Sequence, residues 1–230
     1  MKVVAGIDIG GTAVKLGLVS AEGTVRARAS FPCDPRQSFP GLVRAVSECL
    51  ESLAAGTGAG LGAIGISAPG YADPATGALI DGANNVPALQ GRSLPRALRE
   101  RFGVPAFIDN DGTCAATGEL WYGAGRDFRN FVLITLGTGI GGGVVIDGRP
   151  VIGRGGEPPE IGAICLDPAG PVNYSGVPGT FERLACASGF LELYRRSGGT
   201  EDGARSPEDI FLLAARGDRA AASAIDREGR

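Results

Sequence analysis

Short runs in which hydrophobic residues alternate with polar or small residues open the chain. Three such runs, at residues 2–9, 14–20 and 23–31, predict β-strands, because alternation with a period of two buries one face of a strand. The connections between them are only three or four residues long and contain glycine. Links this short join antiparallel strands, so the first thirty residues are expected to form an antiparallel meander.

A helical pattern follows the meander. Hydrophobic residues recur at 3.6-residue spacing from Leu42 to Leu53, which predicts a helix with one face on the sheet. Further strands are expected at residues 61–67 and 104–110. Between these strands, Ser93 begins a second helix with a proline in its first turn, and Gly103 ends it.

The second half of the chain returns to the opening pattern. A strand at 130–136, a glycine-rich hairpin at 137–143, a strand at 144–147 and a final strand at 149–152 follow one another. This repetition indicates an internal duplication with two similar sheets, although chance similarity between Gly- and Val-rich segments is the alternative. After residue 180 the spacing predicts three helices, at residues 181–196, 206–217 and 218–230.

Composition supports a folded α/β protein. The 39 glycines and 15 prolines among 230 residues follow no G-X-Y period, and the glycines lie between hydrophobic runs. The 22 basic and 25 acidic residues give a net charge of −3 and are not clustered, so a nucleic-acid partner is not expected. The sequence has no histidine. Catalysis that needs an imidazole is therefore excluded, and acid–base chemistry falls to carboxylates.

The five cysteines indicate a reducing environment. Their number is odd, they are far apart, and no two form a C-x-x-C pair, which argues against disulfides and against a structural zinc site. No hydrophobic run approaches the roughly 18 residues needed to span a bilayer. A cytoplasmic protein with no membrane partner is expected.

Two glycine turns are candidates for phosphate binding. Residues 137–142 match G-x-G-x-x-G, but a strand follows where a dinucleotide-binding fold needs a helix. A P-loop is also excluded, since neither Lys2 nor Lys15 has the required neighbours. The remaining possibility is a strand-turn-strand whose backbone N–H groups point at an anion. Turns at residues 10–12 and 137–139 would together hold a polyphosphate, and ordinary glycine hairpins are the alternative.

Two carboxylates stand at the ends of predicted strands. Asp8 directly precedes the first glycine turn, where a carboxylate can hold Mg²⁺ beside phosphates through water. Asp111 follows the strand at 104–110 and can accept a proton from an attacking hydroxyl group. Each has a simpler interpretation: Asp8 as a turn carboxylate at a strand end, and Asp111 as the N-cap of the following helix.

Five segments together resemble the ROK family, named for repressors, open reading frames and kinases. They occur in the family's order over residues 2 to about 196, at 8–19, 67–77, 107–119, 136–153 and 159–162. The resemblance implies the actin-like ATPase (ribonuclease H-like) fold of hexokinases, with two α/β domains around a cleft. We expect an N-terminal domain over residues 1–111 and a second domain over residues 112–230.

The resemblance also implies a function: an ATP- and Mg²⁺-dependent kinase that phosphorylates a sugar such as glucose or an N-acetylhexosamine. The resemblance implies that phosphates are bound by Asp8, Gly10, Gly11, Thr12, Gly137, Thr138 and Gly139. Asp8 would also hold Mg²⁺ through water. It also implies that Asn85, Asn110, Asp111, Glu160 and Glu182 bind the sugar hydroxyls. Asp111 matches the family's catalytic base.

The chain departs from the family pattern in three ways. Ala163 stands where relatives commonly have a histidine that contacts sugar and zinc, and residues 173–182 lack the family's zinc-binding cysteines. No structural zinc is therefore expected, and the sugar site should lack one hydrogen-bonding partner. Family kinases also continue past the last helices here to a region that holds adenosine. We therefore expect a truncated or partly represented chain whose second domain is incomplete.

Two rival functions remain from the sequence. One is a non-catalytic sugar-sensing protein, and the other is an actin-like protein that acts on something other than a sugar, which the segments 109–113 and 159–162 disfavour. ROK repressors carry a DNA-binding helix-turn-helix before the first phosphate motif, and here that motif begins almost at Met1. A DNA-binding version is therefore not expected. Family members often dimerise, which leaves a homodimer open.

Overall fold

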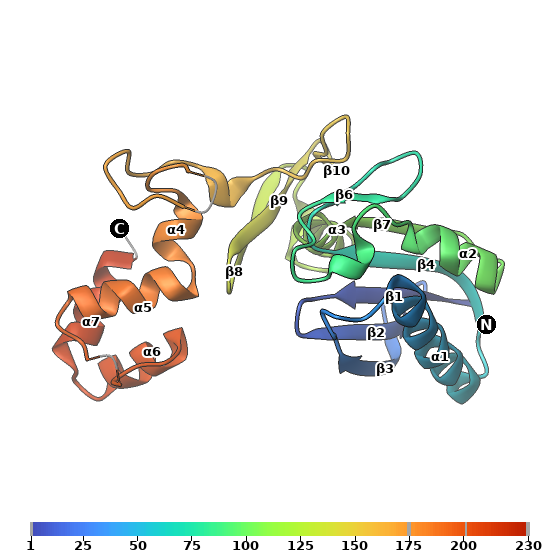
Figure 1. Ribbon diagram of the computed structural model, residues 1–230, viewed down its shortest axis with the longest axis horizontal. Coiled ribbons are helices and arrows are strands. Elements are labelled where there is room, and N and C mark those ends of the chain that lie inside the picture. Colours follow the sequence, from blue (N-terminus) through green and yellow to red (C-terminus); the bar gives the residue numbers. More distant parts are fainter. Residues whose placement is uncertain (1, 174–175, 201, 229–230) are drawn as a thin grey trace. The chain divides into compact units, whose positions relative to one another are not determined.

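The computed structural model describes residues 2–173, 176–200 and 202–228 (Figure 1). The chain forms two compact units, one made of Met1–Phe131 with Gly143–Pro159, and one made of Val132–Gly142 with Glu160–Arg230. The predicted domain boundary after Asp111 stays a prediction. Tyr174 and Ser175, which belong to the segment aligned with the family's zinc cluster, lie outside the described residues.

The first unit is built on a five-stranded sheet, with the strand order β3-β2-β1-β4-β7 (Figure 1). Its strands are β1 (Lys2–Ile9), β2 (Ala13–Val19), β3 (Val25–Pro32), β4 (Gly60–Ala68) and β7 (Ala106–Asn110). β1, β2 and β3 pair in antiparallel fashion, which confirms the predicted meander. β4 and β7 add in parallel, so the carboxyl ends of β1, β4 and β7 share one edge of the sheet.

Helices α1 (Phe39–Thr57) and α2 (Leu94–Phe102) cover one face of this sheet. Each begins at a serine whose hydroxyl oxygen accepts a backbone N–H of the first turn, and each ends at a glycine with positive φ. Their buried faces pack on the inward-pointing residues of β1, β2 and β4. Both predicted helices are thus confirmed. The remaining short elements on this side are β5 (Tyr71–Ala72), β6 (Leu79–Asp81) and the 3-10 turn η1 (Pro87–Leu89).

The opposite face of the sheet is bordered by α3 (Asp111–Tyr122), which η2 (Ala124–Asp127) follows. A groove of about 830 Å³ runs between α3 and the strands. Exposed hydrophobic side chains line much of it, among them Val4, Phe107 and Trp121. The polar end of the same groove contains Asp8 and Asp109. This face therefore carries Asp8, one of the candidate site residues.

The second strand-hairpin-strand segment is present as β8 (Phe131–Leu136), β9 (Ile140–Ile146) and β10 (Arg149–Pro150), in the order β10-β9-β8. The predicted glycine hairpin over residues 137–143 is too long, because β9 already begins at Ile140. Glycines fit inside this strand since its backbone passes close to neighbours. A methyl group on Gly143 would lie 2.5 Å from Cβ of Ala116 in α3. The turn proper is therefore only three residues long.

The helices of the second unit follow η3 (Ile161–Ala163) and are α4 (Phe181–Ala185), α5 (Ala187–Arg196), α6 (Pro207–Ala215) and α7 (Arg219–Glu228). The last three share a small core that includes Phe190, Tyr194, Ile210, Ala221 and Ala224. α6 begins with a capping box, and the carboxylate of Asp218 accepts an N–H at the start of α7. In the described part of the chain, none of the helices combines the length and hydropathy of a membrane span.

One predicted helix of this unit is wrong. The segment 181–196 forms two helices, because Cys186 is extended (ψ 170°) and ends the first of them. The backbone N–H of Ala187, which would bond within a continuous helix, donates instead to the carbonyl oxygen of Gly137 at 2.9 Å. A partner fifty residues away in the sequence thus interrupts a locally helical pattern.

Candidate functional site

The first glycine turn lies in the first unit and connects β1 to β2. The N–H of Gly10 donates to the carbonyl oxygen of Ala13 at 3.0 Å, which closes the turn. The N–H of Cys33 donates to the carbonyl oxygen of Thr12 at 3.0 Å and ties the turn to the end of β3. A methyl group on Gly11 would lie 2.8 Å from Cβ of Asn85. Asn85, a predicted sugar ligand, therefore lies directly against this turn.

Asp8 is one member of a row of polar residues that crosses the sheet. The strand registers place Lys15, Asp8, Ser67 and Asp109 side by side on β2, β1, β4 and β7. The hydroxyl group of Ser67 donates to Oδ1 of Asp8 at 3.1 Å, and Nζ of Lys15 lies 3.6 Å from Oδ2. Half of the Asp8 side chain is exposed, so a cation can reach its carboxylate.

Asp109 and Cys114 form the less accessible part of this region. Burial raises the pKa of the Asp109 carboxyl, and the hydrogen bond from the N–H of Asn110 opposes part of that effect. Burial also raises the pKa of the Cys114 thiol to about 12, helped by the negative charges of Asp109, Asp111 and Asp8. The thiol is therefore protonated at neutral pH and is a poor nucleophile. Asp109 is not among the individually predicted site residues, but it begins the segment 109–113, whose amide and carboxylate side chains are the sequence signal at this position.

Asn110 and Asp111 sit where β7 passes into α3. The side chain of Asn110 is the N-cap: its Oδ1 accepts the N–H groups of Gly112 at 2.9 Å and Thr113 at 3.2 Å. Its Nδ2 donates to the carbonyl oxygen of Gly70 at 2.9 Å. The alternative interpretation of Asp111 as the helix cap is therefore wrong. Asp111 is the first helical residue and is exposed, with one carboxylate oxygen bonded to the next N–H at 2.8 Å.

The raised pKa of Asp109 gives a pH-dependent prediction. A carboxyl whose pKa is higher in the folded state favours folding most at low pH, and this contribution is lost as pH rises from the ordinary value of 3.8 through the folded value. Asp109→Asn should therefore stabilise the fold modestly at pH 7, because the neutral amide avoids the cost of a partly buried charge.

Thermal unfolding at pH 4 and pH 7 measures this effect. The variant's gain in Tm should grow with pH, whereas Asp127→Asn, at an exposed position in the same unit, should change Tm little at either pH. A gain for Asp109→Asn that was equal at the two values would contradict the assigned cause.

The second glycine turn lies in the second unit, between β8 and β9. The N–H of Gly137 donates to the carbonyl oxygen of Gly139 at 3.0 Å. The N–H of Ile140 donates to Oε2 of Glu182, in the first turn of α4, at 2.9 Å. Thr138, at the tip of the turn, is exposed. Glu182, which the family resemblance associates with sugar, thus contacts the phosphate turn.

Glu160 and Ala163 flank the short turn η3 in the same unit. Glu160 immediately precedes η3, and the N–H of Ala163 donates to its carbonyl oxygen at 3.1 Å. The methyl side chain of Ala163 offers no hydrogen bond where relatives commonly have an imidazole.

The predicted site residues thus fall into two groups. The first unit brings together the first turn, Asp8, Asn85, Asn110 and Asp111, and the second unit holds the second turn, Glu160 and Glu182. Within the described ranges, no three Cys, Asp or Glu side chains gather closely enough to hold a metal ion by themselves. A cation at Asp8 would therefore take its other ligands from water and phosphate, which is the usual coordination of Mg²⁺.

Comparison with known proteins gives consistent matches over nearly the whole chain. The model of the ROK family matches residues 4–230. The glucokinase of Thermotoga maritima is 33% identical over 235 residues, which cover 96% of this chain and 73% of that protein. The N-acetyl-D-glucosamine kinase of Pectobacterium atrosepticum is 34% identical over 184 residues, which cover 80% of this chain and 58% of that protein.

Among solved structures, a ROK family glucokinase from Streptomyces griseus, in complex with glucose and AMPPNP, superimposes with a TM-score of 0.77 and 29% identity. The match covers 98% of this chain and 75% of that one. The family resemblance inferred from the five sequence segments and the predicted actin-like α/β fold are both confirmed.

Proposed function

Because the chain belongs to the ROK family and is a sugar kinase of that family, we propose that it transfers the γ-phosphate of ATP to a hydroxyl group of a hexose or an N-acetylhexosamine, with Asp111 as the general base. The observation that carries the assignment of the base is the position of Asp111. Its neighbour Asn110 caps α3, so the carboxylate of Asp111 is not needed as the cap and is exposed at the first turn of the helix.

Asp111 is suited to accepting a proton. It lies at the N-terminus of α3 and is exposed, so a sugar hydroxyl can reach its carboxylate. One of its oxygens accepts the N–H of Gly112, which orients the carboxylate. The proton of the attacking sugar hydroxyl would pass to this carboxylate as the hydroxyl oxygen bonds to the γ-phosphorus. The bond between that phosphorus and the β–γ bridging oxygen would break, and ADP would leave.

The glycine turns would bind the phosphates. The N–H groups of Gly10 and Gly137 already donate within their own turns. The other backbone N–H groups of the turns and the hydroxyls of Thr12 and Thr138 would donate hydrogen bonds to phosphate oxygens. The half-exposed carboxylate of Asp8, beside the first turn, fits Mg²⁺. That ion, when bound, neutralises charge on the phosphate oxygens. Lys15 and Ser67 hold Asp8 in place.

Asn85, Asn110, Glu160 and Glu182 would orient the sugar. Asn110 has limited capacity for this role, since its Oδ1 accepts two N–H groups and its Nδ2 already donates to Gly70. One N–H of the Nδ2 group remains for a sugar oxygen. The side chain of Ala163 contributes no hydrogen bond to a sugar, so sugar selectivity should depend more strongly on Asn85 and Glu160 than in relatives with a histidine at that position.

An ADP-release assay with ATP and Mg²⁺ tests the proposal. Glucose, mannose, N-acetylglucosamine and N-acetylmannosamine are compared with a control without sugar, and at least one sugar should accelerate ADP release by orders of magnitude. Calorimetric titration with the same sugars measures sugar affinity independently of turnover. Binding of a sugar without turnover on any of the four would instead indicate a non-catalytic sugar binder, the alternative that Ala163 favours.

A further inference from the structure

The helix α4 carries Glu182, one of the residues proposed to orient the sugar, and it is only five residues long. A helix this short is unstable by itself, because nucleation is costly and few hydrogen bonds follow it. Each of its residues is also partly exposed, so hydrophobic burial contributes little to its position. The polar contacts that hold α4 therefore decide where the carboxylate of Glu182 lies.

Backbone hydrogen bonds fix the two ends of α4. At its start, the N–H of Phe181 donates to the carbonyl oxygen of Ile164 at 2.8 Å. Just past its end, the N–H of Ala187 donates to the carbonyl oxygen of Gly137 at 2.9 Å. Bonds at the ends of a helix restrain its axis more strongly than its rotation about that axis. The rotation of α4 is therefore set mainly by its side chains.

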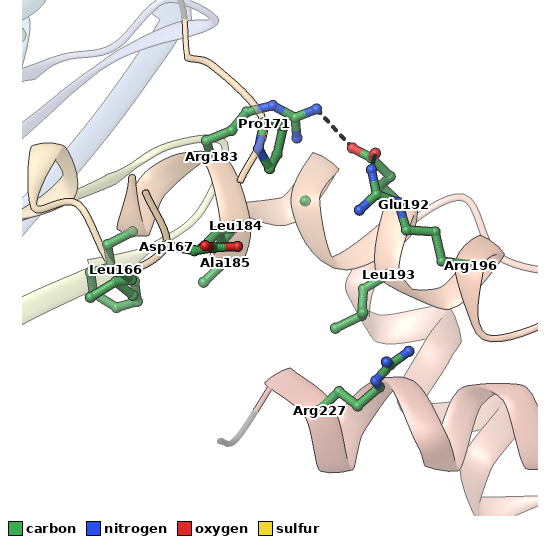
Figure 2. A pocket seen from close by; sticks show the side chains of 12 residues that line it. Leu166, Asp167, Pro171, Arg183, Leu184, Ala185, Glu192, Leu193, Arg196 and Arg227 are labelled. Atoms are coloured by element: carbon green, nitrogen blue, oxygen red, sulfur yellow. Dashed lines mark hydrogen bonds and ion pairs between the residues drawn. The ribbon is translucent and has the colours of Figure 1, made fainter. Parts of the chain in front are cut away.

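Arg183 supplies a side-chain contact from α4 to α5. Its Nη2 lies 2.8 Å from Oε2 of Glu192, and the two side chains are 31% and 33% exposed (Figure 2). Among the residues that the structure describes, this is the one ion pair that joins the two helices. The hydrogen bond and the charge of Arg183 lower the pKa of Glu192, so the carboxylate is ionised at neutral pH. A charge-assisted hydrogen bond at a partly buried position is well suited to restraining a short helix.

Arg196 contacts the same carboxylate without linking the two helices. It lies one turn further along α5 than Glu192, and its guanidinium group bonds to Oε1 (Figure 2). Both partners thus belong to α5 and form an ordinary i,i+4 pair. The carboxylate of Glu192 therefore contacts two guanidinium groups, of which only that of Arg183 restrains α4.

Glu182 and Arg183 point to different sides of α4, because neighbouring residues in a helix are rotated by about 100°. On one side, Oε2 of Glu182 accepts the N–H of Ile140 at 2.9 Å. A carboxylate can accept several hydrogen bonds, so Glu182 can still accept one from a sugar hydroxyl. On the other side, Arg183 contacts Glu192. The ion pair thus restrains the rotation of α4 from outside the sugar site.

We propose that Arg183 is a positioning residue for sugar binding: its ion pair with Glu192 fixes the rotation of α4 and so holds the carboxylate of Glu182 where a sugar hydroxyl meets it. This inference rests on the proposed function, in which Glu182 is a sugar ligand. Hydrogen bonds weaken steeply when their geometry is disturbed, so a small rotation of α4 is enough to weaken this one. Arg183 acts through Glu182 and need not touch the sugar.

The first test compares sugar binding in variants of the two arginines. In Arg183→Ala, the calorimetric Kd for the sugar should rise and kcat/KM for the sugar should fall, each by about 10- to 100-fold. Arg183→Lys should recover most of this loss, because a single nitrogen, Nη2, makes the contact and an ammonium group can replace it. Arg196→Ala is the matched control. It removes a guanidinium group from the same carboxylate without releasing α4, so both parameters should stay within about twofold of wild type.

A double-mutant cycle tests whether Arg183 acts through Glu182. In the Glu182→Ala background the sugar contact is already absent, so Arg183→Ala should change kcat/KM for the sugar by less than about twofold. A full further loss in that background would show that Arg183 acts independently of Glu182 and would overturn the proposal. Thermal unfolding establishes that each variant is folded. If Arg183→Ala does not fold, Glu192→Gln replaces it, since it weakens the same pair and keeps the shape of the side chain.

Calorimetry without ATP separates the positioning role from the kinase function. A sugar that binds without being phosphorylated, and whose Kd rises in Arg183→Ala but not in Arg196→Ala, would support the positioning role and reject the proposed function. In an active kinase, a wild-type sugar Kd for folded Arg183→Ala, or equal losses for the two arginine variants, would reject the positioning role alone. A chain that binds none of the four sugars would reject both.

Discussion

Replacement of Asp111 by asparagine is expected to lower kcat by about 10²- to 10⁴-fold, the usual contribution of a general base, and to leave the sugar Kd within a few-fold of wild type. Asparagine has nearly the same shape and can still accept the N–H of Gly112, so the start of α3 should not change. What is lost is a group that can accept the proton of the sugar hydroxyl. The amide oxygen of asparagine is not basic enough to replace it.

The measurements for this variant are the rate of ADP release at saturating sugar and a calorimetric sugar Kd. Asp127→Asn in the same unit is the control for loss of one surface charge and should retain wild-type kcat. A wild-type kcat for Asp111→Asn would show that another group takes the proton. A large loss of sugar affinity at unchanged kcat would make Asp111 a sugar ligand only.

The second large effect is expected at Gly70, between β4 and β5. Its φ is 77°, and a methyl group there would collide with the backbone carbonyl oxygen of Asp81. Gly70→Ala therefore combines left-handed backbone strain with overpacking against a group that cannot turn aside, and should cost about 3 kcal/mol or more of folding free energy. The carbonyl oxygen of Gly70 accepts Nδ2 of Asn110, so the cap of α3 should be displaced as well.

Gly103, the C-cap of α2, is a matched control for Gly70. Its φ is 65°, but no atom would lie within 4 Å of an added methyl group. Gly103→Ala should therefore cost only the left-handed strain, about 1–2 kcal/mol, and should leave kcat unchanged. Urea unfolding of both variants measures the difference. Equal losses would show that the loop around Gly70 relaxes and does not hold Asn110 in place.

Hydrophobic periodicity and cap residues were sufficient for most of the first unit. Ser93 and Gly103 bound α2 because an N-cap hydroxyl and a left-handed glycine act within a few residues of the chain. The meander likewise follows from alternation and short glycine links. Asp8 and Asp111 could be selected as candidates because each lies at the end of a predicted strand.

The neighbours Asn110 and Asp111 show what local sequence patterns cannot predict, namely which of the two residues caps α3. Either residue type makes a good N-cap, so the sequence leaves the assignment open. The structure decides it through Gly70, whose carbonyl oxygen accepts the amide of Asn110 from forty residues away. An ionised aspartate carboxylate has no N–H to make that bond, and asparagine does.

The sequence by itself therefore determined the elements of the first unit, the two glycine turns and the family, because these depend on spacing within short windows and on the order of motifs along the chain. The tertiary structure decided that Asn110 is the cap, that the helix breaks at Cys186 and that Glu182 holds the second glycine turn. Each of these depends on a backbone N–H or carbonyl group whose partner lies at least forty residues away. Which distant group satisfies a given backbone atom is fixed only when the chain is folded.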